Sequence, residues 1–265
     1  MTSTTVLYQT DGPVATVTLN RPERLNAMNR ELIREAMEIL ERAASDPAIR
    51  VLILTGAGKG FCAGGDLAGF AGGEFKQPQP LEQRVAELRR SMRTSQILRE
   101  SGMVTIAAIN GACAGAGLSW ALACDLRFAA ASAKFSTAFL NAGLSGDFGG
   151  THSLTHIVGT AKARELYLLA ERFDAAEAHR IGLVSRVLPD AELMDHARGV
   201  AGRLADSAPI PLREIKRNLN DALRLSFSEA LDREAERHAF CGTTEDNTEA
   251  AKAFLEKRKP AFKGR

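Results

Sequence analysis

The chain has 265 residues, with 34 Lys or Arg against 32 Asp or Glu, which gives a formal net charge of +2 at pH 7. This length supports one sizeable core with a small appended piece, and the balanced charge argues against a dedicated nucleic-acid binder. The polar N-terminus does not read as a signal peptide, and no apolar run is long enough to span a bilayer. The four cysteines form no C-x-x-C pair. We therefore expect a cytoplasmic protein with no membrane partner.

Strand and helix patterns alternate through the first half of the chain. Residues 14–19 alternate apolar and polar side chains as a strand does, and apolar residues at helical spacing over 32–43 predict a helix. The continuous apolar run 51–54 is typical of a strand buried on both faces. Residues 69–80, rich in Gly, Pro and Gln, predict a loop, and residues 81–100 predict one long helix.

The alternation continues with a second buried strand over 104–109, a helix of small residues over 115–124 and a third strand over 126–129. Beyond these the pattern is mostly helical, apart from one further strand over 183–188. The sequence Asp-Ala-Ala-Glu that begins at Asp174 predicts a helix start with a capping box.

From residue 190 onward the sequence predicts only helices, with Pro209 and Pro211 marking a break. We therefore expect an α/β protein in two parts. Residues 1–200 would form a core of repeated β/α turns, and residues 201–265 a helical C-terminal subdomain.

Two Gly-rich turns carry the strongest chemical signal. The stretches 61–67 and 110–117 each run from a strand through glycines into a helix. Such turns leave backbone N–H groups without acceptors, and two of them together can stabilise one developing oxyanion. The positive end of the helix that begins at Ala116 would point to the same place.

Other motifs are weaker. Residues 56–60 are Gly-rich but lack the spacing of a phosphate-binding loop and its following Ser or Thr. His152 and His156 lie four residues apart, a spacing that could place two ligands on one helix face, but no third ligand is evident. We therefore expect no metal and no redox cofactor.

The order of several short motifs resembles that of the enoyl-CoA hydratase/isomerase (crotonase) superfamily. The similarity extends from about Val14 to Lys263. The segments that carry it are the two Gly-rich turns and residues 107–111, 121–125, 149–151, 180–184 and 254–260.

The resemblance implies a spiral of ββα turns and a helical C-terminal region that drives formation of a homotrimer or a dimer of trimers. It implies an acyl-CoA substrate, so that coenzyme A enters only as part of that substrate. By motif position, the oxyanion donors would be the backbone N–H groups of Gly65 and Ala116. Residues implied to contact the substrate are Ala63, Asp66, Leu67, Ser119, Trp120, Phe139, Leu144 and Phe148.

The chain departs from the hydratases of this family at two positions. The two glutamates that hold and activate water in those enzymes correspond to Ser119 and Phe139 here. A carboxylate occurs instead at Asp147, where hydratases generally have a small residue. This arrangement resembles that of the ring-1,2-epoxyphenylacetyl-CoA isomerase and enoyl-CoA isomerase members, in which an Asp at this place works as a single base. Asp147 could also cap a helix that begins near Phe148.

These features favour double-bond isomerisation of an enoyl-CoA, with Asp147 moving the proton and an apolar wall raising its pKa. One alternative is a hydratase with a rearranged acid–base set that uses Asp147 and Ser119 through water. A second is an acyl-CoA binder without catalysis. A dehalogenase is disfavoured because the helix before residue 107 offers Arg89, Arg90 and Met92 but no His.

Overall fold

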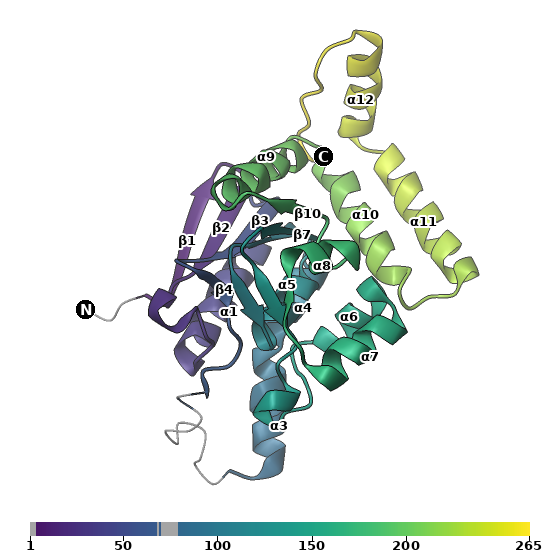
Figure 1. Ribbon diagram of the computed structural model, residues 1–265. Helices are drawn as coiled ribbons and strands as arrows, with labels where there is room; N and C mark the ends of the chain where they lie inside the picture. Colours follow the sequence, from purple (N-terminus) through teal and green to yellow (C-terminus); the bar gives the residue numbers. More distant parts are fainter. Residues whose placement is uncertain (1–3, 68, 70–78) are drawn as a thin grey trace.

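The computed structural model describes residues 4–67, 69 and 79–265, which form two sheets surrounded by helices (Figure 1). Three successive turns of the chain, which begin at Val51, Val104 and Leu126, each contribute one long strand to the first sheet, one short strand to the second sheet, and then one or two helices. The predicted spiral of ββα turns is therefore confirmed.

The larger sheet has six strands and is parallel except at one edge, where β1 pairs antiparallel with β2. Its two central strands are buried along their whole length, as their continuous apolar sequences predicted. In spatial order the strands are β1 (Val6–Asp11), β2 (Val14–Leu19), β3 (Val51–Gly56), β5 (Val104–Ile109), β7 (Leu126–Ala130) and β10 (Arg186–Leu188).

The smaller sheet positions the site. Its strands are β4 (Gly60–Cys62), β6 (Ala112–Ala114), β8 (Lys134–Ser136) and β9 (Phe173–Asp174). The first three are parallel neighbours, with Cys62 opposite Cys113 and Ala114 opposite Ser136. Because the carboxyl ends of parallel neighbours meet at one edge, the segments that follow these three strands lie together.

Some helices of the core contact the sheets, whereas others pack on neighbouring helices. Helix α1 buries Leu32, Ala36, Leu40 and Ala43, and the side chain of Asn29 caps it. Helix α5 is buried on all sides. The helices are α1 (Arg30–Ser45), α3 (Leu81–Ser91), α4 (Arg93–Glu100), α5 (Ala116–Ala123), α6 (Gly150–Val158), α7 (Thr160–Leu169), α8 (Ala175–Arg180) and α9 (Leu193–Ala205), with 3₁₀ turns at Pro22–Arg24, Leu140–Ala142 and Asp190–Glu192.

Some predicted elements differ in extent. The single helix expected over 81–100 is two helices, because the chain leaves regular α-helical geometry at Met92, where ψ is −11°. The strand expected over 183–188 is limited to Arg186–Leu188. Asp174 does cap α8 by accepting a hydrogen bond from the N–H of Glu177, but the predicted capping box is incomplete, because the Glu177 carboxylate pairs with Arg180 and Lys162 instead of the N–H of Asp174. Most of the loop expected over 69–80 lies outside the described residues.

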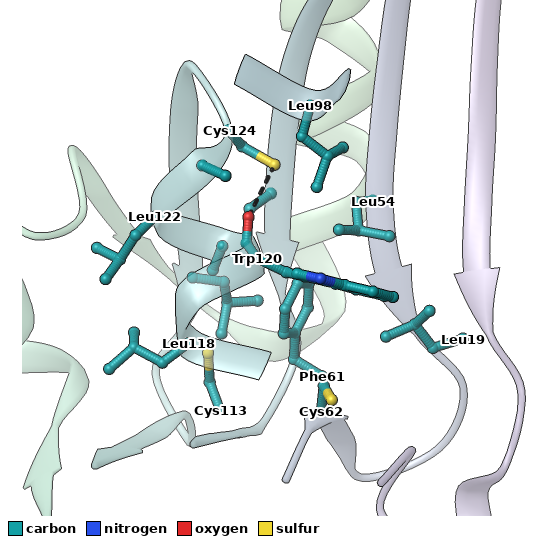
Figure 2. Packing of buried hydrophobic residues seen from close by; sticks show 14 of the residues in the cluster. Leu19, Leu54, Phe61, Cys62, Leu98, Cys113, Leu118, Trp120, Leu122 and Cys124 are labelled. Carbon is teal, nitrogen blue, oxygen red and sulfur yellow. Dashed lines mark hydrogen bonds between the residues drawn. The ribbon is translucent and has the colours of Figure 1, made fainter. Parts of the chain in front are cut away.

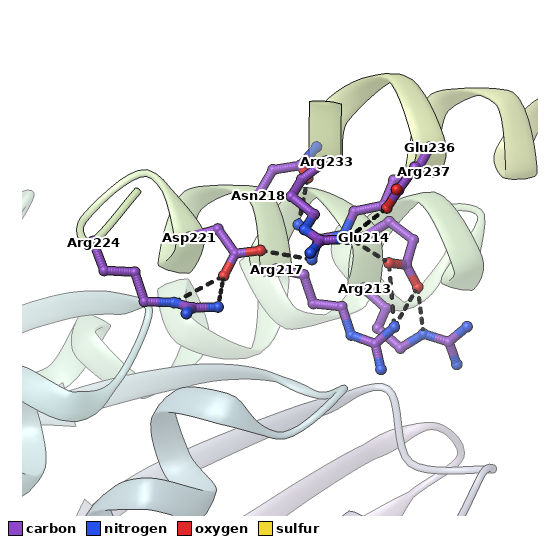
Figure 3. A network of polar contacts seen from close by, with 9 residues as sticks. All are labelled: Arg213, Glu214, Arg217, Asn218, Asp221, Arg224, Arg233, Glu236 and Arg237. Atoms are coloured by element: carbon purple, nitrogen blue, oxygen red, sulfur yellow. Dashed lines mark hydrogen bonds and ion pairs between the residues drawn. The ribbon is translucent and has the colours of Figure 1, made fainter. Parts of the chain in front are cut away.

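Of the C-terminal helices, α10 (Pro209–Asp221) lies against the core, whereas α11 (Phe227–Gly242) and α12 (Glu245–Leu255) extend away from the sheets (Figure 1). Between α10 and α11 lies a polar network, in which Arg237 donates hydrogen bonds to Asn218 and Asp221 (Figure 3). The boundary predicted between residues 200 and 201 falls inside α9, which packs on the large sheet. The division of the chain at that point stays a prediction.

Candidate active site

The two Gly-rich turns lie in direct contact at the edge where β4 and β6 end. A Cβ added to Gly64 would lie 3.0 Å from the carbonyl oxygen of Ala114 and 3.6 Å from the backbone nitrogen of Ala116. A Cβ on Gly117 would lie only 2.3 Å from the carbonyl oxygen of Cys62. Glycine is therefore required on both sides of the contact, and the two turns hold each other in place.

The backbone N–H groups of Gly65 and Ala116 have no acceptor among the described residues. Met28 pairs with the Gly65 turn by donating its N–H to the Gly64 carbonyl at 2.7 Å and accepting the N–H of Asp66 at 3.0 Å. This pattern leaves the N–H of Gly65 pointing away from Met28. Ala116 is the first residue of α5, where the N–H groups have no partner within the helix.

The turn before α5 has a backbone that only glycine adopts readily. Gly115 has φ 51° and ψ −125°, and its N–H donates to the carbonyl of Ser136 on the neighbouring strand. Ser119, one helical turn further on, donates its N–H to the Gly115 carbonyl at 3.0 Å. The peptide group before Gly115 is therefore held through its N–H, and the peptide group between Gly115 and Ala116 through its carbonyl.

Asp147 lies on the segment that precedes α6, between two residues with left-handed backbone. Gly146 has φ 115° and Phe148 has φ 49°, an unfavourable conformation for a bulky side chain. Asp147 does not cap α6, because the cap is Gly149 with no side-chain hydrogen bond. Its Oδ1 is buried and has no partner among the described residues. Burial raises the pKa of Asp147 to about 6.

Aromatic side chains border this carboxylate. The rings of Phe139 and Tyr167 stack with centroids 6.1 Å apart and planes 4° from parallel. A Cβ on Gly146 would lie 3.5 Å from Tyr167 Cε1, and one on Gly115 would lie 3.9 Å from Phe139 Cε1. The stacked pair therefore extends from the Asp147 segment to the turn before α5.

The other predicted contact residues differ in exposure. Ala63 and Asp66 belong to the first turn, and Asp66 forms an ion pair with Arg21 at 2.9 Å. Burial would raise the pKa of Asp66, but the hydrogen bond and charge of Arg21 outweigh burial and lower it. Leu67 and Leu144 are 60% and 50% exposed, which leaves their side chains open to contact with a ligand.

Trp120 has a different place from the one expected. Its ring is fully buried in the core beside Leu19, Leu54 and Phe61 (Figure 2). It also contacts Phe148 edge to face, with centroids 5.9 Å apart. Trp120 thus supports Phe148 from the core side and does not itself present a surface to a ligand. The motif places Ser119 and Trp120 next to each other on the helix but does not say which of the two side chains faces the site. Successive residues of a helix point in directions about 100° apart, so only one of them can do so.

Tyr167 is the residue of this site that the sequence did not reveal. It belongs to α7, far along the chain from both turns, and its neighbours Leu168 and Leu169 are exposed. Burial, with a contribution from the Asp147 charge, raises the pKa of Tyr167 to about 12, although a hydrogen bond with Ser119 lowers it. A single Tyr within an ordinary helical pattern gives no signal of such a role.

Among the described residues, no group of three or more His, Cys, Asp or Glu side chains is arranged to hold a metal ion. A cavity of about 690 Å³ lies between α4, α6 and α10. Phe148 and Gly149 reach it, but Asp147 and the two turns do not line it. The chemistry suggested by the turns and by Asp147 therefore lies outside this cavity.

Comparison with known proteins agrees with this geometry. A family model described as enoyl-CoA hydratase/isomerase matches residues 9–265. The chain is 37% identical to the 1,2-epoxyphenylacetyl-CoA isomerase of Escherichia coli and 35% identical to the short-chain-enoyl-CoA hydratase of Clostridium acetobutylicum, each over 98% of both chains. The crystal structure of an enoyl-CoA hydratase from Bacillus anthracis superposes with a TM-score of 0.92 at 32% identity, covering 98% of this chain and 100% of that one.

The chain belongs to the enoyl-CoA hydratase/isomerase family, the crotonase superfamily. It is therefore an enzyme of a family that acts on acyl-CoA thioesters.

Proposed function

We propose that this chain shifts the double bond of an enoyl-CoA, with Asp147 as the only proton carrier. The observations that carry the proposal are the half-buried Asp147, whose buried Oδ1 has no partner among the described residues, and the two backbone N–H groups that have no acceptor among those residues. A carboxylate oxygen of this kind is left for a substrate proton, since no group of the described residues forms a hydrogen bond with it.

The two N–H groups supply the electrostatic part of the reaction. The thioester oxygen would accept hydrogen bonds from Gly65 and Ala116, and these bonds strengthen as negative charge develops on the enolate. Removal of one donor from a site of this kind costs about 3–4 kcal/mol of transition-state stabilisation. Two such donors make the carbon next to the thioester acidic enough for a carboxylate base.

Asp147 then moves one proton between two carbons. Its carboxylate accepts the proton from one end of the three-carbon unit, and the resulting carboxylic acid returns it to the other end. Because burial raises its pKa to about 6, Asp147 is a stronger base than an exposed Asp and still ionised at neutral pH. No oxidant, metal or further cofactor is needed, since coenzyme A is part of the substrate.

Hydration is the second candidate. It needs a group that activates water on one side and a group that protonates carbon on the other. Ser119 and Phe139 supply no carboxylate, which favours isomerisation. However, the hydroxyls of Ser119 and Tyr167 lie near Asp147 and could hold a water molecule. The similarity to a short-chain-enoyl-CoA hydratase also supports this candidate.

Product analysis in deuterated water separates the candidates. The enzyme is incubated with a 2-enoyl-CoA and, separately, with a 3-enoyl-CoA. We expect a shifted double bond and deuterium at the carbons that exchange. If the main product is a 3-hydroxyacyl-CoA, the enzyme is a hydratase and the proposed isomerisation is wrong. If both substrates are recovered unchanged and without deuterium, the protein binds acyl-CoA but catalyses neither reaction.

A proline substitution tests the oxyanion hole itself. Ala116→Pro removes the N–H at the first position of a helix, where proline is best tolerated. We expect a folded protein that has lost most of its turnover. Ala175→Pro makes the same change at the first position of α8, which begins after Asp174, and should leave turnover unchanged. A folded Ala116→Pro enzyme with full activity would place the thioester oxygen elsewhere.

A further inference from the structure

The cavity between α4, α6 and α10 has a positively charged lining. Five of the residues that line it are arginines and two are acids, so their formal charges sum to +3 when histidine is counted as neutral. The arginines are Arg89, Arg99, Arg217, Arg224 and Arg237. A concave surface lined mainly by one sign of charge concentrates the electric field and attracts ions of the opposite sign. The lining of this cavity therefore favours an anion.

The arginines on the α10–α11 wall of the cavity already have acidic partners. Arg224 and Arg237 both pair with Asp221, and Arg217 pairs with Glu214 at 2.9 Å (Figure 3). These ion pairs lie within the polar network between the two helices. Their positive charge is largely compensated by the protein itself.

The opposite wall, formed by α3 and α4, carries positive charge without such partners. Arg89 donates a hydrogen bond to the amide oxygen of Gln96 at 3.3 Å and forms no ion pair among the described residues. Arg99 takes part in hydrogen bonding only through its backbone carbonyl, which accepts from Asn220. Glu100, the acid of this wall, accepts instead from Gln96 at 2.8 Å. Two guanidinium groups without a carboxylate partner among the described residues therefore line one cavity.

A buried hydroxyl on the same wall also lacks a partner. Ser95 lines the cavity, is only 7% exposed, and its Oγ has no hydrogen-bond partner among the described residues. Serines in helices often bond the carbonyl one turn earlier, and nearly all buried hydroxyls are paired. Gly149, which also lines the cavity, begins α6 without a side-chain cap, so the first N–H groups of that helix add positive partial charge.

We propose that this cavity binds an organic anion that carries a carboxylate, with Arg89 and Arg99 as its cationic partners. A guanidinium can bind a carboxylate through two parallel hydrogen bonds, which are among the stronger hydrogen bonds in proteins. The cavity volume of about 690 Å³ lies within the range of sites for small organic molecules.

The carboxylate has two possible sources. One is a free organic acid. The other is the far end of an acyl chain bound as its CoA thioester, because Phe148 lines the cavity and directly follows Asp147 in the chain. The acyl source rests on the proposed function, which places the thioester beside Asp147, whereas the free acid does not.

The test measures binding by calorimetry on the full-length protein in the assembly that it forms. Adipate is the probe for a free acid, with inorganic phosphate for comparison. Succinyl-, adipoyl- and suberoyl-CoA are the probes for an acyl chain. Each is compared with the thioester of equal length that lacks the second carboxylate, which is butanoyl-, hexanoyl- or octanoyl-CoA.

Arg99→Gln and Arg89→Gln each remove one of the two charges but keep a polar side chain. The matched control is Arg93→Gln. Arg93 also lies on α4, so the change in net charge is the same, but it pairs with Glu41 and does not line the cavity. Circular dichroism checks that all three variants are folded.

We expect wild-type protein to bind adipate, or to bind a dicarboxylic thioester about 10–100-fold more tightly than its neutral counterpart, the range for hydrogen bonds to a charged group. Arg99→Gln should abolish this binding or preference, Arg89→Gln should weaken it, and Arg93→Gln should preserve it. Adipate binding without a thioester preference assigns the cavity to a free acid, and a thioester preference assigns it to the acyl chain.

Three results would overturn the proposal. One is the absence of both adipate binding and any thioester preference in the wild type. Another is an equal effect of Arg99→Gln and Arg93→Gln. The third is inorganic phosphate that binds as tightly as adipate, which would contradict the carboxylate class. If the neutral thioesters themselves fail to bind, the proposed acyl-CoA site is wrong, and the adipate titration still decides whether the cavity binds an organic acid.

Discussion

At the scale of the residue, Asp147 combines three unfavourable features: a buried oxygen without a partner, a raised pKa, and a neighbour, Phe148, with φ 49°. Each of these reduces the stability of the folded state and is found most often at functional sites. A residue that served only structure would have found a hydrogen-bond partner, for example as the cap of α6. The geometry of Asp147 is thus better explained by chemistry than by folding.

The first prediction concerns Asp147→Asn, for which turnover should fall by about 100-fold or more, as for loss of a general base. Stability should rise at high pH. The pKa of Asp147 is about 6 in the folded protein against an ordinary 3.8, so ionisation opposes folding as pH rises through this range, and the penalty is complete above it. Thermal unfolding at pH 8 should show a gain on the order of 1–2 kcal/mol that disappears near pH 4.

Asp195→Asn is the control for this prediction, because the side chain of Asp195 is 84% exposed on α9. It should change neither turnover nor the pH dependence of stability. Near-normal turnover of Asp147→Asn would remove Asp147 from the proposed mechanism, whatever its effect on stability.

The sequence located the backbone donors and the carboxylate better than the side chains around them. The strand–glycine–helix pattern is local and located the two turns, and the resemblance to the family named Gly65 and Ala116 within them. The structure shows both N–H groups without an acceptor among the described residues, and their role stays a prediction. Tyr167 and the burial of Trp120 depend on how distant helices pack. No local sequence pattern predicts how distant helices pack. For this reason the sequence predicted only part of the aromatic surroundings of Asp147.

At the scale of the element, the contact between the two turns depends on Gly117, which lies inside α5. Alanine normally stabilises a helix relative to glycine by about 0.5–1 kcal/mol. Here a Cβ would lie 2.3 Å from the Cys62 carbonyl oxygen and 2.8 Å from Cys62 Sγ, on the strand that leads to Gly65. A clash at this point must move one turn away from the other.

The second prediction is therefore that Gly117→Ala lowers both thermal stability and turnover, with turnover falling at least 10-fold because the two N–H groups no longer converge on one oxygen. Gly199→Ala is the matched control. Gly199 also lies inside a helix, α9, but nothing lies within 4 Å of its added Cβ. That variant should be slightly more stable and fully active. An active, stable Gly117→Ala enzyme would show that the turns need not touch.

A buried cation, Lys216, links helix α10 to the core, in addition to the hydrogen bond from Asn220 to the carbonyl of Arg99. Lys216 forms an ion pair with Asp125 at 2.8 Å and donates hydrogen bonds to the carbonyls of Leu98 and Met103. The Asp125 carboxylate also accepts from the N–H and hydroxyl of Thr105 on β5. Removal of the cation would leave buried acceptors unpaired, which is more costly than loss of an exposed ion pair.

The third prediction is that Lys216→Met destabilises the protein by about 3 kcal/mol in denaturant unfolding, because it removes the cation paired with the partly buried Asp125 carboxylate and the donor to the Met103 carbonyl. Lys252→Met on α12, an exposed site, should change stability by less than about 0.5 kcal/mol. Equal stability of the two variants would mean that α10 is held by its apolar contacts alone.

The elements themselves were largely predictable, because apolar periodicity follows directly from which faces are buried. Strands β2, β3 and β5 and helix α1 match their expected ranges closely. The break at Met92 was not predictable, because no Gly or Pro marks it. The strand expected over 183–188 was too long, because an apolar run does not reveal where pairing with β7 stops.

At the scale of the whole molecule, the C-terminal helices leave large apolar side chains uncovered. Phe227, Phe254 and Leu255 are each about 80% exposed, at 80%, 84% and 79%. Large apolar side chains that are exposed together in this way often mark a surface that contacts another protein chain. Together with the family resemblance, they support our proposal that α10–α12 assemble the protein into a trimer or a dimer of trimers.

The fourth prediction follows from this surface. Light scattering after gel filtration should give at least three times the chain mass of 28.5 kDa. Phe254→Asp combined with Phe227→Asp should shift the protein to smaller species, because charges would replace the apolar contacts. Leu7→Asp, at a 40% exposed position on β1, should leave the assembly unchanged. A wild-type protein that elutes as a monomer at all concentrations would contradict the proposed assembly.

The separation of the oxyanion turns from the segment that carries Asp147 has a consequence for how such enzymes diversify. In the proposed reaction, main-chain groups after β4 and β6 would stabilise the enolate, and most side-chain substitutions leave such groups intact. A side chain after β8, on the segment that ends at α6, would move the proton. A duplicated gene could therefore exchange one reaction for another through a few codons in that segment, while the part of the site that makes the carbon acidic is inherited unchanged.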